Sequence, residues 1–126
     1  MTSSANIYIA VVDDDESLCR SLGRLLRAAG IQPIIYHSAE AFLADAKHPT
    51  FDCLLLDIRL GGMSGIELAQ RLGSATPVIF MTAHDEPEVR AQACQTGCAA
   101  YLRKTDSAET MLAAIRKAVS DAPAKS

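Results

Sequence analysis

Five polar residues each follow an apolar segment, and their side chains could together bind a metal ion and a phosphoryl group: Asp13, Asp14, Asp57, Thr82 and Lys104. Three carboxylates in one place repel each other, and the single charge of Lys104 does not neutralise them. A hard divalent ion such as Mg²⁺ would do so, since it binds oxygen ligands and usually needs only one or two carboxylates. Asp57 could then act as a nucleophile toward a phosphoryl group, whose charge the ion, Thr82 and Lys104 would share.

The segments before these residues have the composition of buried strands. Residues 53–56 are apolar on both faces, as strands of a parallel sheet are, and Asp57 follows where this strand leaves the sheet. In open α/β sheets, ligands bind at the edge formed by the carboxyl ends of the strands. Further strands are predicted over 7–12, 34–36 with Pro33 in the first position, 77–81 and 99–102.

Helical spacing and capping signals separate the strands. The first helix is predicted between Leu18 and Ala29, with Asp15 as a capping residue. Ser38 is the expected N-cap of a helix over 39–46, and Ser64 and Glu67 have the capping-box pattern before a helix over 65–72. Two more are predicted over about 87–97 and 107–119. Five strand–helix units predict an α/β fold, a parallel sheet covered by helices on both faces.

Composition restricts the class of protein. The 126 residues are 49% apolar, which suits one domain with a core over about 7–119 and a tail or linker start at 121–126. A net charge of −3 argues against direct contact with nucleic acid. The absence of a long apolar run and of signal-peptide features predicts a cytoplasmic protein without a membrane segment. The four cysteines form no C-x-x-C pair and are expected to be free thiols packed as small hydrophobes: Cys19, Cys53, Cys94 and Cys98.

Five motifs in order resemble those of response-regulator receiver domains of bacterial two-component signalling. They are Val11-Val12-Asp13-Asp14, Leu54-Leu55-Leu56-Asp57, Met63-Ser64-Gly65, Met81-Thr82-Ala83 and Tyr101-Leu102-Arg103-Lys104. Residues 38–43, Ser-Ala-Glu-Ala-Phe-Leu, are similar to receivers that precede LuxR-type DNA-binding domains. The chain departs from the family pattern at Gly61 and Thr105, where proline is usual.

The resemblance implies a flavodoxin-like (CheY-like) doubly wound sheet of five parallel strands in the order 2-1-3-4-5, with five helices. It implies that Asp57 accepts a phosphoryl group from a histidine kinase, with Thr82 and Lys104 on that group. Mg²⁺ would be held by Asp13, Asp14, Asp57 and the backbone carbonyl of Arg59.

The resemblance also suggests how the phosphoryl group is used. Arg59 and His84 would tune the lifetime of the phosphate, because they flank the path of attacking water. Thr82 and Tyr101 would act as the switch. The helix over 87–96, the strand over 99–102 and the helix over 107–119 would form the face that changes, for homodimerisation or for an output domain or partner, with transcription as the expected output.

Other interpretations stay open. Asp13 and Asp14 alone could belong to a charged loop that caps the first helix, and Asp57 alone would most often be a turn residue. Thr82 alone would be an N-cap or turn residue, and Lys104 a solvated surface charge. The chain could be a single-domain regulator or a phosphate-independent pseudo-receiver that only binds partners. We do not expect an enzyme beyond self-phosphorylation from phosphodonors and slow autodephosphorylation, since Arg59 occupies the place of the second acidic residue of haloacid-dehalogenase-type phosphatases.

Overall fold

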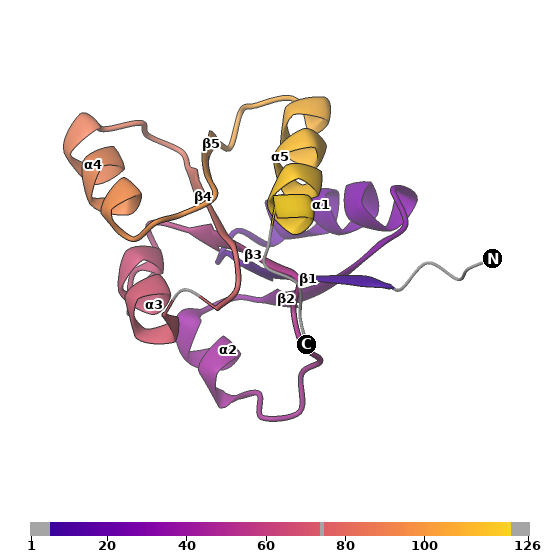
Figure 1. Cartoon of the computed structure of the whole chain (residues 1–126). Coiled ribbons are helices and arrows are strands. Elements are labelled where there is room, and N and C mark those ends of the chain that lie inside the picture. The colour runs from indigo at the N-terminus through magenta and orange to yellow at the C-terminus, as the bar shows by residue number, and fades with distance from the viewer. Residues whose placement is uncertain (1–5, 74, 122–126) are drawn as a thin grey trace.

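The protein forms one parallel β-sheet with helices on both faces (Figure 1). The structure is a computed structural model, and it describes residues 6–73 and 75–121. All strand pairs are parallel and the strand order is β2-β1-β3-β4-β5, which confirms the predicted fold. The strands are β1 (Ile7–Val12), β2 (Ile31–Tyr36), β3 (Cys53–Asp57), β4 (Val78–Thr82) and β5 (Ala100–Arg103).

The second strand begins earlier than the sequence predicted. Pro33 is its third residue and pairs with Ile9 of β1, whereas a first position was expected. Because β2 lies at the edge of the sheet, the missing N–H of the proline interrupts no ladder between two neighbours. A proline inside this strand is therefore tolerated.

The helices are α1 (Glu16–Ala28), α2 (Ala39–Ala44), α3 (Gly65–Leu72), α4 (Pro87–Gln95) and α5 (Ala108–Asp121). Their starts agree with the predicted caps: Asp15 and Ser38 accept backbone N–H groups of α1 and α2, and Ser64 and Glu67 form a capping box on α3. Helix α2 ends at Ala44, two residues before the predicted end. Helix α5 includes Asp121, which was expected in the tail; residues 122–126 lie outside the described residues.

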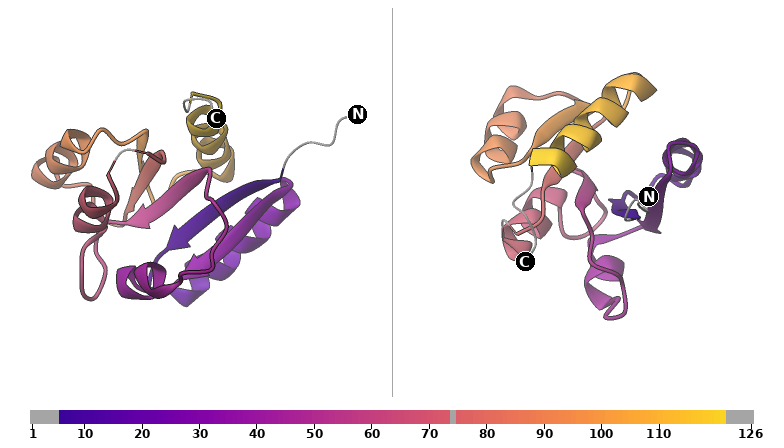
Figure 2. Two further views of the ribbon diagram at one scale, coloured as in Figure 1. Left: turned by 60° about the horizontal axis from the view of Figure 1, so that its bottom comes forward. Right: turned by 45° about the vertical axis from the view of Figure 1, so that its right-hand side comes forward.

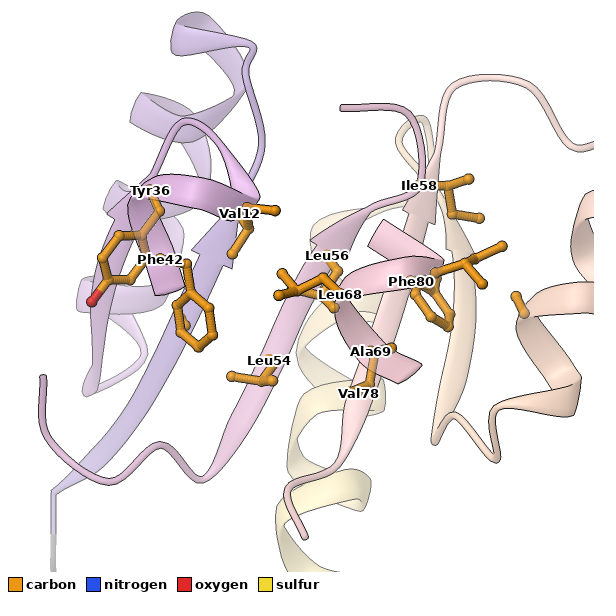
Figure 3. Packing of buried hydrophobic residues seen from close by; sticks show 14 of the residues in the cluster. Val12, Tyr36, Phe42, Leu54, Leu56, Ile58, Leu68, Ala69, Val78 and Phe80 are labelled. Carbon is orange, nitrogen blue, oxygen red and sulfur yellow. The ribbon is translucent and has the colours of Figure 1, made fainter. Parts of the chain in front are cut away.

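Two apolar clusters fill the two faces of the sheet. On one face, alternate strand residues such as Leu54, Leu56 and Phe80 pack against Phe42 of α2 and Leu68 of α3 (Figure 3). Helices α1 and α5 cover the other face (Figure 2). There the intervening strand residues, such as Ile9, Val11 and Leu55, pack with Leu22 and Leu26 of α1 and Ile115 of α5. Because helices cover both faces of the sheet, a functional site is expected at the edge formed by the carboxyl ends of the strands.

Among the described residues, no helix combines the length and the apolar character needed to cross a bilayer.

Candidate functional site

The carboxyl ends of four strands bring the predicted residues to one edge of the sheet. Asp13 directly follows β1, Asp57 ends β3, Thr82 ends β4 and Lys104 directly follows β5. Strands β1, β3 and β4 are consecutive neighbours in the sheet, and β5 flanks β4. Asp13, Asp57 and Thr82 are the buried polar side chains among the described residues, with exposed fractions of 0%, 3% and 2%. The edge is therefore a polar site set into the core.

Lys104 joins two of the buried carboxylates. Its Nζ donates a hydrogen bond of 3.0 Å to Asp57 Oδ2 and lies 2.9 Å from Asp13 Oδ2. Thr105 follows it where proline was the family expectation, and no peptide bond in the described residues is cis. Lys104 nevertheless reaches both aspartates, so the aim of this side chain does not depend on proline at the next position.

The pKa shifts at this site indicate that the single charge of Lys104 does not neutralise Asp13 and Asp57. Burial raises the pKa of Asp57 to about 6, although the hydrogen bond from Lys104 lowers it, and the charge of Asp13 raises it again. Burial alone would lower the pKa of Lys104, but its contacts with Asp13 and Asp57 outweigh that effect and raise it. Excess negative charge thus remains at the site at neutral pH.

The excess charge and the donor atoms fit a divalent cation. Asp13, Asp14 and Asp57 each offer one ligand oxygen, and these oxygens lie within 4.8 Å of one another. Asp13 Oδ2 is buried, and no donor among the described residues makes a well-aligned hydrogen bond to it. Asp14 is exposed, so the cluster of carboxylates is accessible to solvent on this side. Mg²⁺ prefers such oxygen ligands and retains several waters.

Comparison with known proteins agrees with this geometry. The family described as "Response regulator receiver domain" matches residues 9–116. The chain belongs to this family. It is a response-regulator receiver domain, of the kind that operates in phosphorylation-type signalling.

Three similar proteins illustrate the match. The response regulator protein TmoT of Ectopseudomonas mendocina is 34% identical over 91% of this chain and 54% of its own length. A response regulator receiver protein from Burkholderia phymatum is 39% identical, with a TM-score of 0.81 over 94% of this chain and 100% of that one. A response regulator from Burkholderia pseudomallei, solved with a phosphorylated aspartic acid, calcium ion and citrate, is 26% identical, with a TM-score of 0.79 over 92% and 70%. The chain spans about half the length of the curated relatives it matches.

The first aspartate of this receiver domain is fixed by contacts that the sequence did not suggest. The backbone N–H of Asp13 donates to Tyr36 O (3.0 Å), and Asp13 Oδ1 accepts the N–H of Asp15 (2.9 Å). Its carbonyl oxygen accepts from the Cys19 thiol (3.3 Å) and lies 3.2 Å from Nδ1 of His37. Contacts from α1 and from the end of β2 therefore orient Asp13. Its Oδ2 atom is buried and accepts no well-aligned hydrogen bond from the described residues.

The loop after Asp57 is held without the usual proline. The Arg59 N–H donates to Asp57 Oδ1 (3.1 Å), and Glu40, from the first turn of α2, accepts the N–H of Met63 (3.1 Å). That hydrogen bond lowers the pKa of Glu40. Gly61, where proline was expected, has no atom near the place of a Cβ. The contact from Glu40, which lies within the motif Ser38-Ala39-Glu40, thus supports the loop from outside.

The Thr82 hydroxyl and the Arg59 guanidinium have their described contacts away from the carboxylates. The Thr82 hydroxyl donates to His84 O (2.7 Å) and accepts the N–H of His84 (3.1 Å). The Arg59 side chain forms an exposed ion pair with Glu86, the N-cap residue of α4. The Arg59 carbonyl stays a predicted metal ligand, because the contacts described for Arg59 are those of its N–H and guanidinium.

Proposed function

We propose that this receiver domain is a signalling switch that accepts a phosphoryl group on Asp57 from a phosphohistidine of a histidine kinase. An Asp57 oxygen forms the new P–O bond, the P–N bond breaks, and the released imidazole takes up a proton. The observation that supports this best is the buried Asp57 carboxylate with Lys104 Nζ at 3.0 Å and two further carboxylates beside it. The reaction needs mainly positioning and charge neutralisation.

A divalent cation completes the proposal. Asp13, Asp14 and Asp57 would hold Mg²⁺, with the Arg59 carbonyl as the further expected ligand. When bound, the ion neutralises charge on the phosphoryl oxygens. Lys104, whose Nζ lies 3.0 Å from Asp57 Oδ2, would share the charge of the phosphoryl group on that residue. The phosphorylated aspartate and calcium ion of the Burkholderia pseudomallei relative support this assignment by analogy.

The whole protein would work as a relay in the cytoplasm and not as an independent enzyme, beyond taking phosphoryl from small donors and losing it slowly. Since curated relatives such as TmoT are about twice as long as this chain, we propose that an output domain or partner carries out the response. The relative "Transcriptional regulatory protein FixJ" supports a transcriptional output. A single-domain regulator is the alternative.

Acetyl phosphate with Mg²⁺ is expected to add one phosphate to the wild-type protein, measured by intact mass. Asp57→Asn should remove the adduct, because the nucleophilic oxygen is lost. Asp52→Asn is the matched control: this aspartate precedes the same strand at its opposite end and binds Tyr8 N–H, so the adduct should persist. An adduct that survives Asp57→Asn, or forms equally well with excess chelator, would contradict the proposal. A wild-type protein that takes up no phosphate would favour a phosphate-independent interaction module.

A chain of contacts connects Thr82 with the proposed output face. Thr82 binds the backbone of His84, and the next residue, Asp85, accepts hydrogen bonds from Arg90 of α4 (3.3 Å) and Arg103 of β5 (3.1 Å). The Arg90 guanidinium lies 5.2 Å from the centre of the Tyr101 ring. If Thr82 turned to a phosphoryl oxygen, its bonds to His84 would break. That change would reach α4 and β5 through Asp85.

Tyr101 is placed to respond. The sequence predicted a switch role for this residue. Its hydroxyl oxygen is buried in this structure and has no hydrogen-bond partner among the described residues. A buried, unpaired hydroxyl costs about 1–3 kcal/mol. The present arrangement of Tyr101 is therefore not strongly favoured, and a modest change at Thr82 and Asp85 could move it.

Addition of a beryllofluoride phosphate mimic is expected to change backbone NMR shifts across α4, β5 and α5 as well as around Asp57. In Thr82→Ala the distant changes should shrink, because the hydroxyl can no longer leave His84 for the mimic. Thr82→Ser keeps the hydroxyl and is the matched control. Shift changes confined to the loops around Asp13, Asp57 and Lys104 would exclude the switch, including its use for dimerisation or partner docking.

Arg59→Ala and His84→Ala are expected to change the hydrolysis rate of the aspartyl phosphate more than its formation. An effect of up to about tenfold corresponds to about 1.4 kcal/mol in the barrier, a reasonable size for an exposed side chain beside the water path. Single-turnover decay of the phosphorylated protein measures it. Glu86→Gln releases Arg59 from its ion pair and serves as the comparison. Unchanged decay in both alanine variants would disprove these roles.

A further inference from the structure

Two of the four cysteines lie together at the end of α4. Cys94 is in the last turn of α4, and Cys98 follows the helix just before β5. Cys94 is exposed and Cys98 is half-buried, whereas Cys19 and Cys53 are buried. The sequence-based expectation that all four pack as core hydrophobes is therefore wrong for Cys94.

The turn between them returns the chain at Cys98 to the last turn of α4, which contains Cys94. Thr96 donates its N–H to Ala93 O (3.1 Å), and Gly97 donates its N–H to Cys94 O (3.0 Å). Gly97 has φ +77°, the left-handed conformation that ends helices and reverses the chain. The residue after such a glycine characteristically returns to the last turn of the helix.

The two thiols also influence each other. Burial raises the pKa of the Cys98 thiol, and the side chain of Cys94 raises it further. Cys98 lines an open cavity of about 370 Å³ between the ends of α3, α4 and α5, together with Thr96, Gly97 and Ala99. A small reagent can therefore approach this turn from solvent, while the exposed Cys94 thiol needs no opening of the fold.

We propose that Cys94 and Cys98 form a reversible disulfide by exchange with a low-molecular-weight disulfide of the glutathione class. The Cys94 thiolate attacks one sulfur of the reagent, giving a mixed disulfide and one released thiolate. The Cys98 thiol then loses its proton, attacks Cys94 Sγ and releases the second thiolate. Two protein thiols are oxidised, one reagent disulfide is reduced, and the two protons end on the two released thiols.

A disulfide at this position would constrain the end of α4. A disulfide needs Cβ atoms about 3.5–4.5 Å apart, and the reversal of the chain at Gly97 returns Cys98 to the last turn of α4. Any adjustment would fall at the end of α4, where helix ends fray readily. The disulfide would tie the last turn of α4 to the start of β5. This chemistry does not depend on phosphorylation of Asp57, so the two proposals are tested separately.

Peptide mapping after treatment with oxidised glutathione tests the pair. Trypsin cleavage after Arg90 and Arg103 yields one peptide, residues 91–103, that contains both cysteines, while Cys19 and Cys53 fall in other peptides. We expect the folded protein to show this peptide with the loss of two hydrogens, restored by dithiothreitol. The peptides with Cys19 and Cys53 should stay unmodified, because those thiols are buried.

Three variants separate the steps. Cys98→Ser should stop at a glutathione adduct on Cys94. Cys94→Ser should slow the modification of Cys98, because this thiol is half-buried and burial raises its pKa. Gly97→Ala, which strains the left-handed turn, should reduce the yield of the internal bond without removing either thiol. A wild-type protein that accumulates the Cys94 adduct without the internal disulfide, or that forms it no better folded than unfolded in urea, would overturn the proposal.

Discussion

In the absence of metal, Asp57→Asn is expected to raise the free energy of unfolding at neutral pH, by about 1–3 kcal/mol. Burial outweighs the contact with Lys104 and raises the pKa of Asp57 from 3.8 to about 6. Each pKa unit corresponds to about 1.4 kcal/mol, so the ionised carboxylate destabilises the folded protein by an amount of this order. Asparagine keeps the shape and removes the charge, and Lys104 retains Asp13 as its partner.

The raised pKa of Asp57 also determines how the stability of the protein depends on pH. A carboxyl group whose pKa is higher in the folded state binds its proton more tightly there, so its contribution to stability is complete below pH 3.8. That contribution is lost as the pH rises through about 6. The wild-type protein should therefore lose stability between about pH 4 and 6 relative to Asp57→Asn. Urea unfolding in a chelator, followed over this range, measures the difference.

Asp14→Asn is the matched control for this experiment. Asp14 belongs to the same cluster of carboxylates but is exposed, so its removal in metal-free buffer should change stability much less. Added Mg²⁺ should stabilise the wild-type protein by mass action, and Asp57→Asn should lose most of that gain. An Asp57→Asn protein that is less stable than wild type without metal would show that the Lys104 contact outweighs burial.

The sequence predicted the location of the site because local signals decide it. Strands such as 53–56 are recognisable by their apolar character, and the polar residues that follow them meet at one edge in any parallel sheet. Caps such as Ser64 depend on residues three positions away, which a sequence displays directly. The strand order itself came from family resemblance and not from composition.

Contacts between residues far apart in the chain could not be predicted from the sequence. Glu40 reaches Met63 across 23 positions, and Arg103 reaches Asp85 across 18, so no periodic pattern indicates either pair. The direction of the Thr82 hydroxyl was also unpredictable, since a short polar side chain can bind nearby backbone as readily as a ligand. Exposure of Cys94 depends on how α4 is placed, which its sequence spacing does not reveal.

Gly65→Ala is expected to destabilise the protein and to disturb the phosphoryl-acceptor loop together. A Cβ at this position would lie 2.2 Å from the backbone oxygen of Asp57 and 3.2 Å from Ile58 Cα. Both contacts are with backbone, and the Gly65 N–H donates to Ile58 O (3.1 Å), so neither side can yield easily. Overpacking of this kind costs about 1–3 kcal/mol and sometimes more.

Gly61→Ala provides the matched control, because it adds the same methyl group to the loop that leads from Asp57 to α3. Nothing lies within 4 Å of a Cβ there, and the position does not need the left-handed conformation. We expect it to be neutral or to stabilise by up to about 1 kcal/mol, through a less flexible unfolded chain. Urea unfolding of both variants, with phosphate uptake from acetyl phosphate as the second measurement, distinguishes the effects. If Gly65→Ala matched Gly61→Ala in both, the close approach of α3 to Asp57 would not position the acceptor.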